Sequence, residues 1–132
     1  MRLTVVDWNV NGFSQGAQAQ FLGSLEWDVA CLQEVTRATW EEFRALGDQA
    51  DVAFGHLPPL AGVGPRYGCA VVVRLPARLE SFTVLRDMPS PERAGVAVVR
   101  LAGRRVWVGS WAAPPGVTWG SAGKGRQVER FA

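Results

Sequence analysis

Two short apolar runs, each followed by a polar residue, constrain the fold of this chain most. Residues 3–8 are rich in valine and lead to Asn9, while residues 28–33 lead to Glu34. The segment between them, residues 17–25, carries apolar side chains at helical spacing. A strand–helix–strand order favours parallel neighbouring strands. We therefore expect Asn9 and Glu34 at the same edge of a sheet, where α/β proteins bind ligands.

The remainder of the chain predicts one more helix and then mostly strands. Thr39 and Glu42 fit a capping box for a helix that runs to Leu46. A last helix is expected from residue 124 onward. This order predicts an α/β chain, with a mixed sheet and helices on at least one face, in one partial domain over residues 1–132. Strands are expected at residues 52–56, 68–74, 79–85, 95–101 and 106–111.

Composition excludes several classes of protein. The net charge is only +2, which is too small to indicate nucleic-acid binding by charge alone. The chain has no apolar run long enough for a membrane span, and its first residues do not form a signal peptide. Cys31 and Cys69 lie in apolar runs without a disulfide pattern, so we expect buried free thiols. These features predict a cytoplasmic protein without a membrane partner.

Asn9 and Glu34 together offer an amide oxygen and a carboxylate at the predicted edge. Such oxygen ligands suit Mg²⁺, which keeps waters or substrate phosphate oxygens in the rest of its shell. Spacing alone also allows a simpler interpretation, in which Asn9 is a turn residue and Glu34 a surface charge.

Two motifs make the sequence similar to a known family. Thr-Val-Val-Asp-Trp-Asn-Val-Asn-Gly at residues 4–12 and Trp-Asp-Val-Ala-Cys-Leu-Gln-Glu-Val at residues 27–35 resemble the opening motifs of the endonuclease/exonuclease/phosphatase family. Their separation is also that of the family, and residues 67–74, 91–101 and 106–111 resemble its next strands. The resemblance covers nearly the whole chain but about the first half of the family's domain. It implies half of a four-layered, DNase I-like α/β sandwich.

The resemblance also implies an activity and a set of site residues. The family hydrolyses phosphodiesters or phosphomonoesters with Mg²⁺ or Mn²⁺, so a nuclease acting on nucleic acid is the favoured expectation. Glu34 matches the metal-binding glutamate, and Asn9 matches the asparagine beside it, which holds the metal water or the phosphate. Asn11 matches a weaker substrate-binding position. Arg93 and Lys124 are further candidates for phosphate contact, with solvated surface charges as the alternative.

Two departures from the family pattern predict that the chain is inactive alone. The family's functional His or Tyr falls on Ala112 here, or on Trp111 in another register, and neither side chain donates a strong hydrogen bond. The family's Asp-x-Asn motif and closing Asp-His pair have no counterpart after Trp111. The only histidine, His56, lies on the wrong side of the chain order for that role. A truncated enzyme is one interpretation; a non-catalytic binding or assembly module is the alternative.

A half-domain with a single sheet would leave one apolar sheet face without a partner. Alternate residues of 70–73, 96–99 and 106–108 would lie on that face. Exposed apolar area of this kind leads to association. We therefore expect the chain to pair with a missing C-terminal half or to self-associate.

Overall fold

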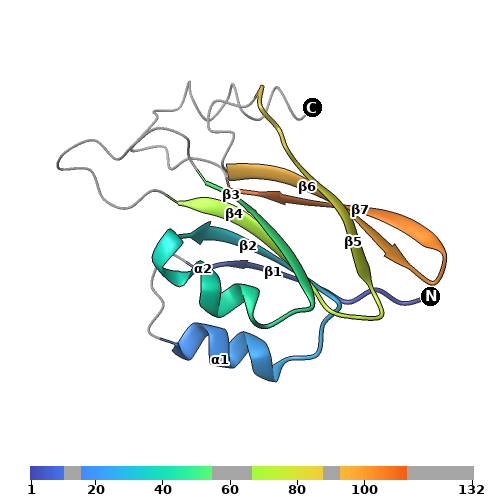
Figure 1. Ribbon diagram of the computed structural model, residues 1–132, viewed down its shortest axis with the longest axis horizontal. Coiled ribbons are helices and arrows are strands. Elements are labelled where there is room, and N and C mark those ends of the chain that lie inside the picture. Colours follow the sequence, from blue (N-terminus) through green and yellow to red (C-terminus); the bar gives the residue numbers. More distant parts are fainter. Residues whose placement is uncertain (11–15, 55–66, 88–92, 113–132) are drawn as a thin grey trace.

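Two packed β-sheets, with two helices on one outer face, make up the part of the chain that the structure describes (Figure 1). The computed structural model describes residues 1–10, 16–54, 67–87 and 93–112. In chain order the elements are β1 Val5–Asn9, α1 Ala17–Ser24, β2 Val29–Val35, α2 Arg37–Arg44, β3 Gln49–Ala53, β4 Gly68–Val73, β5 Arg78–Val84, β6 Ala94–Leu101 and β7 Arg104–Trp111.

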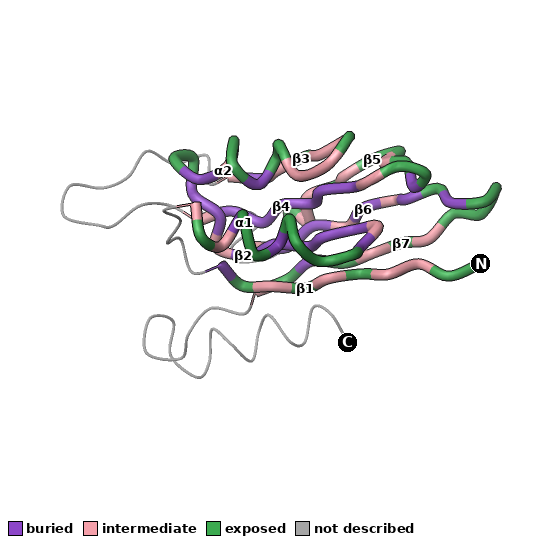
Figure 2. Tube along the Cα trace, turned by 90° about the horizontal axis from the view of Figure 1, so that it is seen from below, coloured by how far each residue is buried: buried purple, intermediate pink, exposed green. Residues whose placement is uncertain are grey.

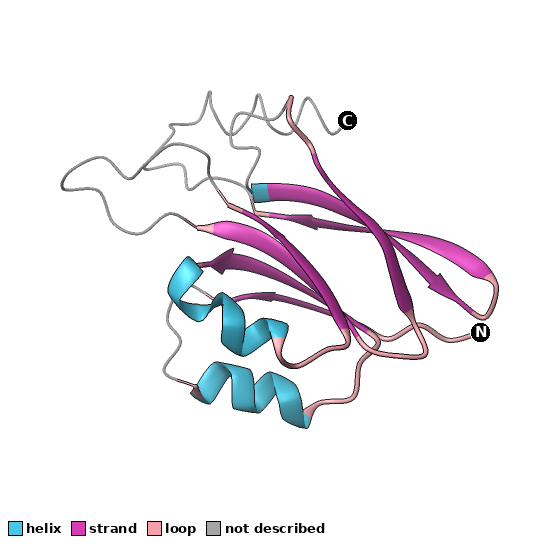
Figure 3. Cartoon of the chain, in the orientation of Figure 1, coloured by secondary structure: helices cyan, strands magenta, loops and turns pink. Residues whose placement is uncertain are grey.

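The first sheet has the strand order β1-β2-β4-β3 and is mixed, as predicted. β1 and β2 are parallel, whereas β4 runs antiparallel to both of its neighbours, β2 and β3. Both helices cover the same face of this sheet (Figures 1 and 3). β4 is apolar and buried along its whole length, which requires cover on both faces of the sheet.

One hydrophobic core lies between the helices and the first sheet. Side chains alternate along a strand, so Ala30 and Leu32 of β2 point to this side. They pack against Leu22 of α1 and Phe43 of α2, which are fully buried. The tube in Figure 2 shows the buried stretches passing through β2 and β4.

Helix α2 begins earlier than predicted, so the predicted capping box of Thr39 and Glu42 is wrong. Thr36 is the N-cap, and its backbone N–H donates to Oγ1 of Thr39 at 3.2 Å. The chain enters the helix almost as soon as β2 ends, which places Thr39 in the buried first turn and leaves Glu42 exposed. The box is therefore closed by two threonines instead of a threonine and a glutamate.

The second sheet, β5-β6-β7, is antiparallel and packs on the face of the first sheet that is opposite to the helices. Val71 and Val73 of β4 contact a cluster that includes Ala97 and Val99 of β6. The expectation of a single sheet with an uncovered inner face is therefore wrong. β4 already pairs with β2 and β3, so the next strand, β5, cannot pair with it and belongs to the second sheet.

The remaining expectations for single elements have mixed outcomes. The strand predicted at residues 52–56 is β3, Gln49–Ala53. Cys31 and Cys69 are buried free thiols, as predicted. Neither helix of the described residues is long and apolar enough to cross a membrane. The helix predicted from residue 124 lies outside the described residues.

Candidate functional site

β2 contains one extra residue beside Glu34. Leu32 pairs with Ala70 and Val35 with Gly68, so β2 advances three residues, 32 to 35, while β4 advances two, 70 to 68. A Cβ atom at Gly68 would lie 2.0 Å from the carbonyl oxygen of Ala53, so this close approach requires glycine. The irregularity is a β-bulge, a feature that commonly redirects a side chain next to a functional site.

The bulge changes the direction in which Glu34 points. Strict alternation would place it on the helix side with Leu32, but Val35 occupies that side instead. The backbone of Glu34 has a φ of 57°, the left-handed region that non-glycine residues rarely adopt. Its carboxylate Oε1 lies 3.9 Å from Nη1 of Arg93, which directly precedes β6 of the second sheet. A strained residue that carries a carboxylate is a candidate functional residue.

Asn9 lies beside this bulge because β1 and β2 are parallel. Asn9 is the register partner of Gln33, the residue before Glu34, and the next residue, Val10, donates its N–H to the carbonyl oxygen of Gln33 at 3.0 Å. The predicted parallel pairing is confirmed, and both strands end at the same edge. Asn9 is an exposed residue at this edge.

Arg93 and Ala112 meet at the same end of the second sheet. The backbone N–H of Ala112 donates to the carbonyl oxygen of Arg93 at 3.0 Å, just beyond the pair Ala94 and Trp111. The Arg93 side chain is only 18% exposed, and its buried Nη1 has no hydrogen-bond partner among the described residues. The 3.9 Å to Glu34 is an ion-pair distance, too long for a hydrogen bond. Ala112 contributes a methyl group to this end and no polar side chain.

Three polar residues behind the site were not predicted to matter. Nε2 of Gln33 donates to Oδ1 of Asp7 at 2.6 Å and to Oγ of Ser110 at 2.9 Å. Gln33 and Ser110 are both buried. The available signal was a glutamine inside a strand that is otherwise apolar, because a buried amide must find hydrogen-bond partners.

The donor set can be compared with the needs of a divalent cation. The described residues contain no group of three or more His, Cys, Asp or Glu side chains that could hold a metal ion. Glu34 and Asn9 offer a carboxylate and an amide oxygen, a set that fits Mg²⁺ when waters and phosphate oxygens complete the shell. Nη1 of Arg93, for which the described residues supply no hydrogen-bond acceptor, fits an anion such as a phosphoryl group.

Cys31 lies in the core behind the site and does not serve as a nucleophile. Burial raises the pKa of its thiol to about 12, and the nearby charge of Asp7 adds to the increase. The thiolate is the reactive form of cysteine, so this side chain stays protonated and unreactive at neutral pH.

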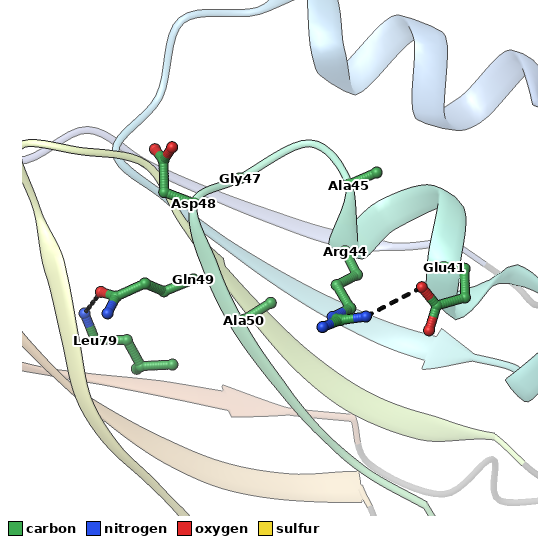
Figure 4. A pocket seen from close by; sticks show the side chains of 8 residues that line it. All are labelled: Glu41, Arg44, Ala45, Gly47, Asp48, Gln49, Ala50 and Leu79. Atoms are coloured by element: carbon green, nitrogen blue, oxygen red, sulfur yellow. Dashed lines mark hydrogen bonds and ion pairs between the residues drawn. The ribbon is translucent and has the colours of Figure 1, made fainter.

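Other candidate positions lie elsewhere or cannot be placed. Asn11, His56 and Lys124 are outside the described residues. A polar hollow of about 530 Å³ lies where α2 leads into β3, toward the opposite end of the first sheet (Figure 4). It is lined by Glu41, Arg44, Ala45, Gly47, Asp48, Gln49, Ala50 and Leu79. None of the predicted site residues is among them.

The fold is that of the DNase I-like class of α/β proteins. A family model described as "Endonuclease/Exonuclease/phosphatase family" matches residues 8–131. The chain therefore belongs to the endonuclease/exonuclease/phosphatase family, as its motifs predicted. No curated protein sequence matches the chain.

Three solved structures with the same fold can be aligned with most of this chain. A humanized D. rerio TDP2 with 14 mutations has a TM-score of 0.64 at 15% identity, and the match covers 98% of this chain and 57% of that one. ANGEL2, a 2′,3′-cyclic phosphatase, has a TM-score of 0.55 at 13% identity, with 81% and 39% covered. D. rerio TDP2 complexed with a single-strand DNA product has a TM-score of 0.53 at 18% identity, with 81% and 44% covered. The chain thus spans between 39% and 57% of these proteins.

Proposed function

We propose that this chain provides the metal-binding part of a phosphoesterase that uses Mg²⁺ or Mn²⁺ to hydrolyse phosphodiester bonds, with nucleic acid as the favoured substrate. Family membership supports the reaction class, and the single-strand DNA product in one related structure supports the substrate. The observation that carries the proposal is Glu34, which a bulge holds in a left-handed conformation beside the end of β1. The two free thiols fit a reducing compartment, so we also propose a cytoplasmic location.

Each residue of the site has a distinct proposed role. The carboxylate of Glu34 would bind the cation directly, and the amide oxygen of Asn9 would bind it or its water. The guanidinium of Arg93 would donate to the phosphoryl oxygens, because its buried Nη1 has no other acceptor among the described residues. A bound divalent cation supplies charge neutralisation at those oxygens and activation of water. Asn11 and Lys124 remain proposed substrate contacts.

We further propose that this chain alone does not turn over substrate. Ala112 has no group that could act as an acid or a base, and Glu34 is committed to the cation in this scheme. The remaining catalytic groups would come from a segment equivalent to the rest of the related domains. Hydrolysis would then require that segment to complete the edge at which Asn9, Glu34 and Arg93 meet.

Cation binding tests the proposal directly. We expect Mn²⁺ to bind the chain, as followed by electron paramagnetic resonance, and Glu34→Gln to weaken binding by about tenfold or more. Glu42→Gln is the matched control, because Glu42 is an exposed carboxylate on α2, outside the site. Equal Mn²⁺ affinities in all three proteins would exclude a metal role for Glu34. Hydrolysis of a single-stranded DNA oligonucleotide by this chain, lost in Glu34→Ala, would contradict the proposed inactivity.

A second candidate function is a non-catalytic module that binds nucleic acid or assembles with another chain. The methyl group of Ala112, at a position where the family carries His or Tyr, favours it. Fluorescence anisotropy with labelled single-stranded DNA in EDTA separates the two candidates. Binding that survives Glu34→Gln but is lost in Arg93→Gln would support the module. Sedimentation velocity over a range of concentrations tests whether the module assembles with a second copy of this chain, and a concentration-independent monomer would exclude that form of assembly.

A further inference from the structure

The side chain of Gln33 joins three strands that belong to two different sheets. Its Nε2 donates to Asp7 on β1 at 2.6 Å and to Ser110 on β7 at 2.9 Å. Its two amide hydrogens therefore serve these two short bonds, and a third, longer contact of 3.4 Å runs from Nε2 to the carbonyl oxygen of Cys31 on its own strand. Gln33 is 5% exposed and Ser110 is 2% exposed, so water competes little for the bond between them, whereas the bond to Asp7 is partly buried.

These bonds lie directly next to the candidate metal site. Gln33 is the residue before Glu34, and Ser110 is two residues before Ala112, whose N–H donates to the carbonyl oxygen of Arg93. Most of the packing between the sheets at their centre is apolar, in a cluster that includes Cys31, Val71 and Val99. Apolar contacts hold two sheets together but are non-directional, so they set no fixed register between them. The amide supplies that direction at the edge where the site lies.

We propose that Gln33 is a positioning residue, which fixes Glu34 relative to Arg93 by joining β2 to β1 and to β7. The inference rests on the proposed function, because it concerns the same cation site. Glu34 holds a backbone conformation that costs free energy and persists only when its surroundings impose it. With the Gln33 amide removed, the segment that follows would relax, and the carboxylate would lose its fixed distance from the Arg93 guanidinium.

A matched pair of glutamines allows this role to be separated from simple stabilisation. Gln49 on β3 also joins the two sheets, because its Oε1 accepts the N–H of Leu79 on β5 at 2.7 Å (Figure 4). That bond lies at the opposite end of the first sheet, since Gln49 pairs with Val73 whereas Val35 pairs with Gly68. Each of the substitutions Gln33→Met and Gln49→Met replaces an amide side chain with an apolar one of similar size. Each also removes a hydrogen bond between the sheets.

Both variants should lower Tm, but only Gln33→Met should disturb the site. We expect it to shift the backbone amide NMR signals of Glu34 and Arg93 and to weaken Mn²⁺ binding by about 10- to 100-fold, the usual range for residues that orient metal ligands. Gln49→Met should leave both unchanged. Asp7→Asn keeps an oxygen that can accept the Gln33 bond, so it should retain Mn²⁺ affinity. Ser110→Ala removes the hydroxyl that accepts the other Gln33 bond, so it should weaken Mn²⁺ binding. If Gln33→Met fails to fold, Ser110→Ala provides the same test.

The outcomes separate this inference from the proposed function. If the natural chain binds Mn²⁺ and Gln33→Met binds it equally well, the positioning role is wrong and the metal site stands. If the natural chain binds no Mn²⁺, the proposed function fails, and the amide shifts alone decide whether Gln33 fixes Glu34. Equal shifts at Glu34 and Arg93 in the Gln33 and Gln49 variants would overturn the positioning role.

Discussion

Glu34 combines a candidate metal-binding side chain with an unfavourable backbone conformation. A left-handed conformation costs an ordinary residue about 1 to 2 kcal/mol, whereas glycine adopts it freely. Glycine would therefore adopt this φ of 57° at a lower cost in free energy than glutamate does. The glutamate at this position is consistent with selection for the carboxylate and not for stability.

This conflict predicts that two substitutions at Glu34 differ in their effect on stability. Glu34→Ala and Glu34→Gly both remove the carboxylate that faces Arg93, but only glycine relieves the backbone strain. We expect Glu34→Gly to be more stable than Glu34→Ala by about 1 kcal/mol in urea unfolding, with cation binding lost in both. A Glu34→Ala protein that is as stable as Glu34→Gly would show that the left-handed conformation carries no cost.

The second sheet is held at one end by a charge network that links its three strands. Glu80 on β5 lies 2.6 Å from Nε of Arg100 on β6 and 2.8 Å from Nε of Arg105 on β7. The hydrogen bond from Arg100, together with the charges of Arg100 and Arg105, lowers the pKa of Glu80. The network is largely exposed, so solvent and salt weaken it.

The lowered pKa gives the stability a dependence on pH with a defined sign. The contribution of ionised Glu80 is fully present above the unfolded pKa of about 4.3 and is lost as pH falls through the lower folded value. We expect the Tm difference between the natural protein and Glu80→Gln to shrink between about pH 5 and pH 3. A difference that is constant over this range, at low salt, would exclude the network as its cause.

The described part of the molecule has three layers, in which β2 and β4 contribute side chains to both cores. Val72 packs in the core beneath the helices, and Val71 packs in the core between the sheets. Both side chains are fully buried and are neighbours on one strand. A disturbance of either core therefore acts on the same central strand, and the layers should unfold together.

This arrangement predicts a single unfolding transition that both cores control. Val71→Ala and Val72→Ala each remove two methyl groups from a buried site and should each cost about 1 to 3 kcal/mol. In both variants, transitions followed by far-UV circular dichroism and by tryptophan fluorescence should coincide. Two separated transitions in Val71→Ala would show that the second sheet unfolds as an independent unit.

Much of the local structure could be predicted from sequence because it depends on short-range patterns. Apolar runs marked β1, β2 and β4, and the strand–helix–strand order predicted the parallel pairing of β1 with β2. The motifs around Asn9 and Glu34 identified the family and the edge at which these residues lie. The capping box was misplaced because Thr36 and Thr39 both suit a cap, and burial of the first turn decided between them.

The sequence by itself therefore determined the class of fold and the edge at which the two candidate residues lie, whereas tertiary contacts decided how their surroundings are built. The division of the strands into two sheets, the bulge at Glu34 and the close approach of Gly68 to Ala53 all depend on contacts between strands that are distant in the sequence. The hydrogen bond from Gln33 to Ser110 joins residues that are far apart in the chain. Local patterns carry no record of such long-range contacts, because they form only when the two sheets pack together.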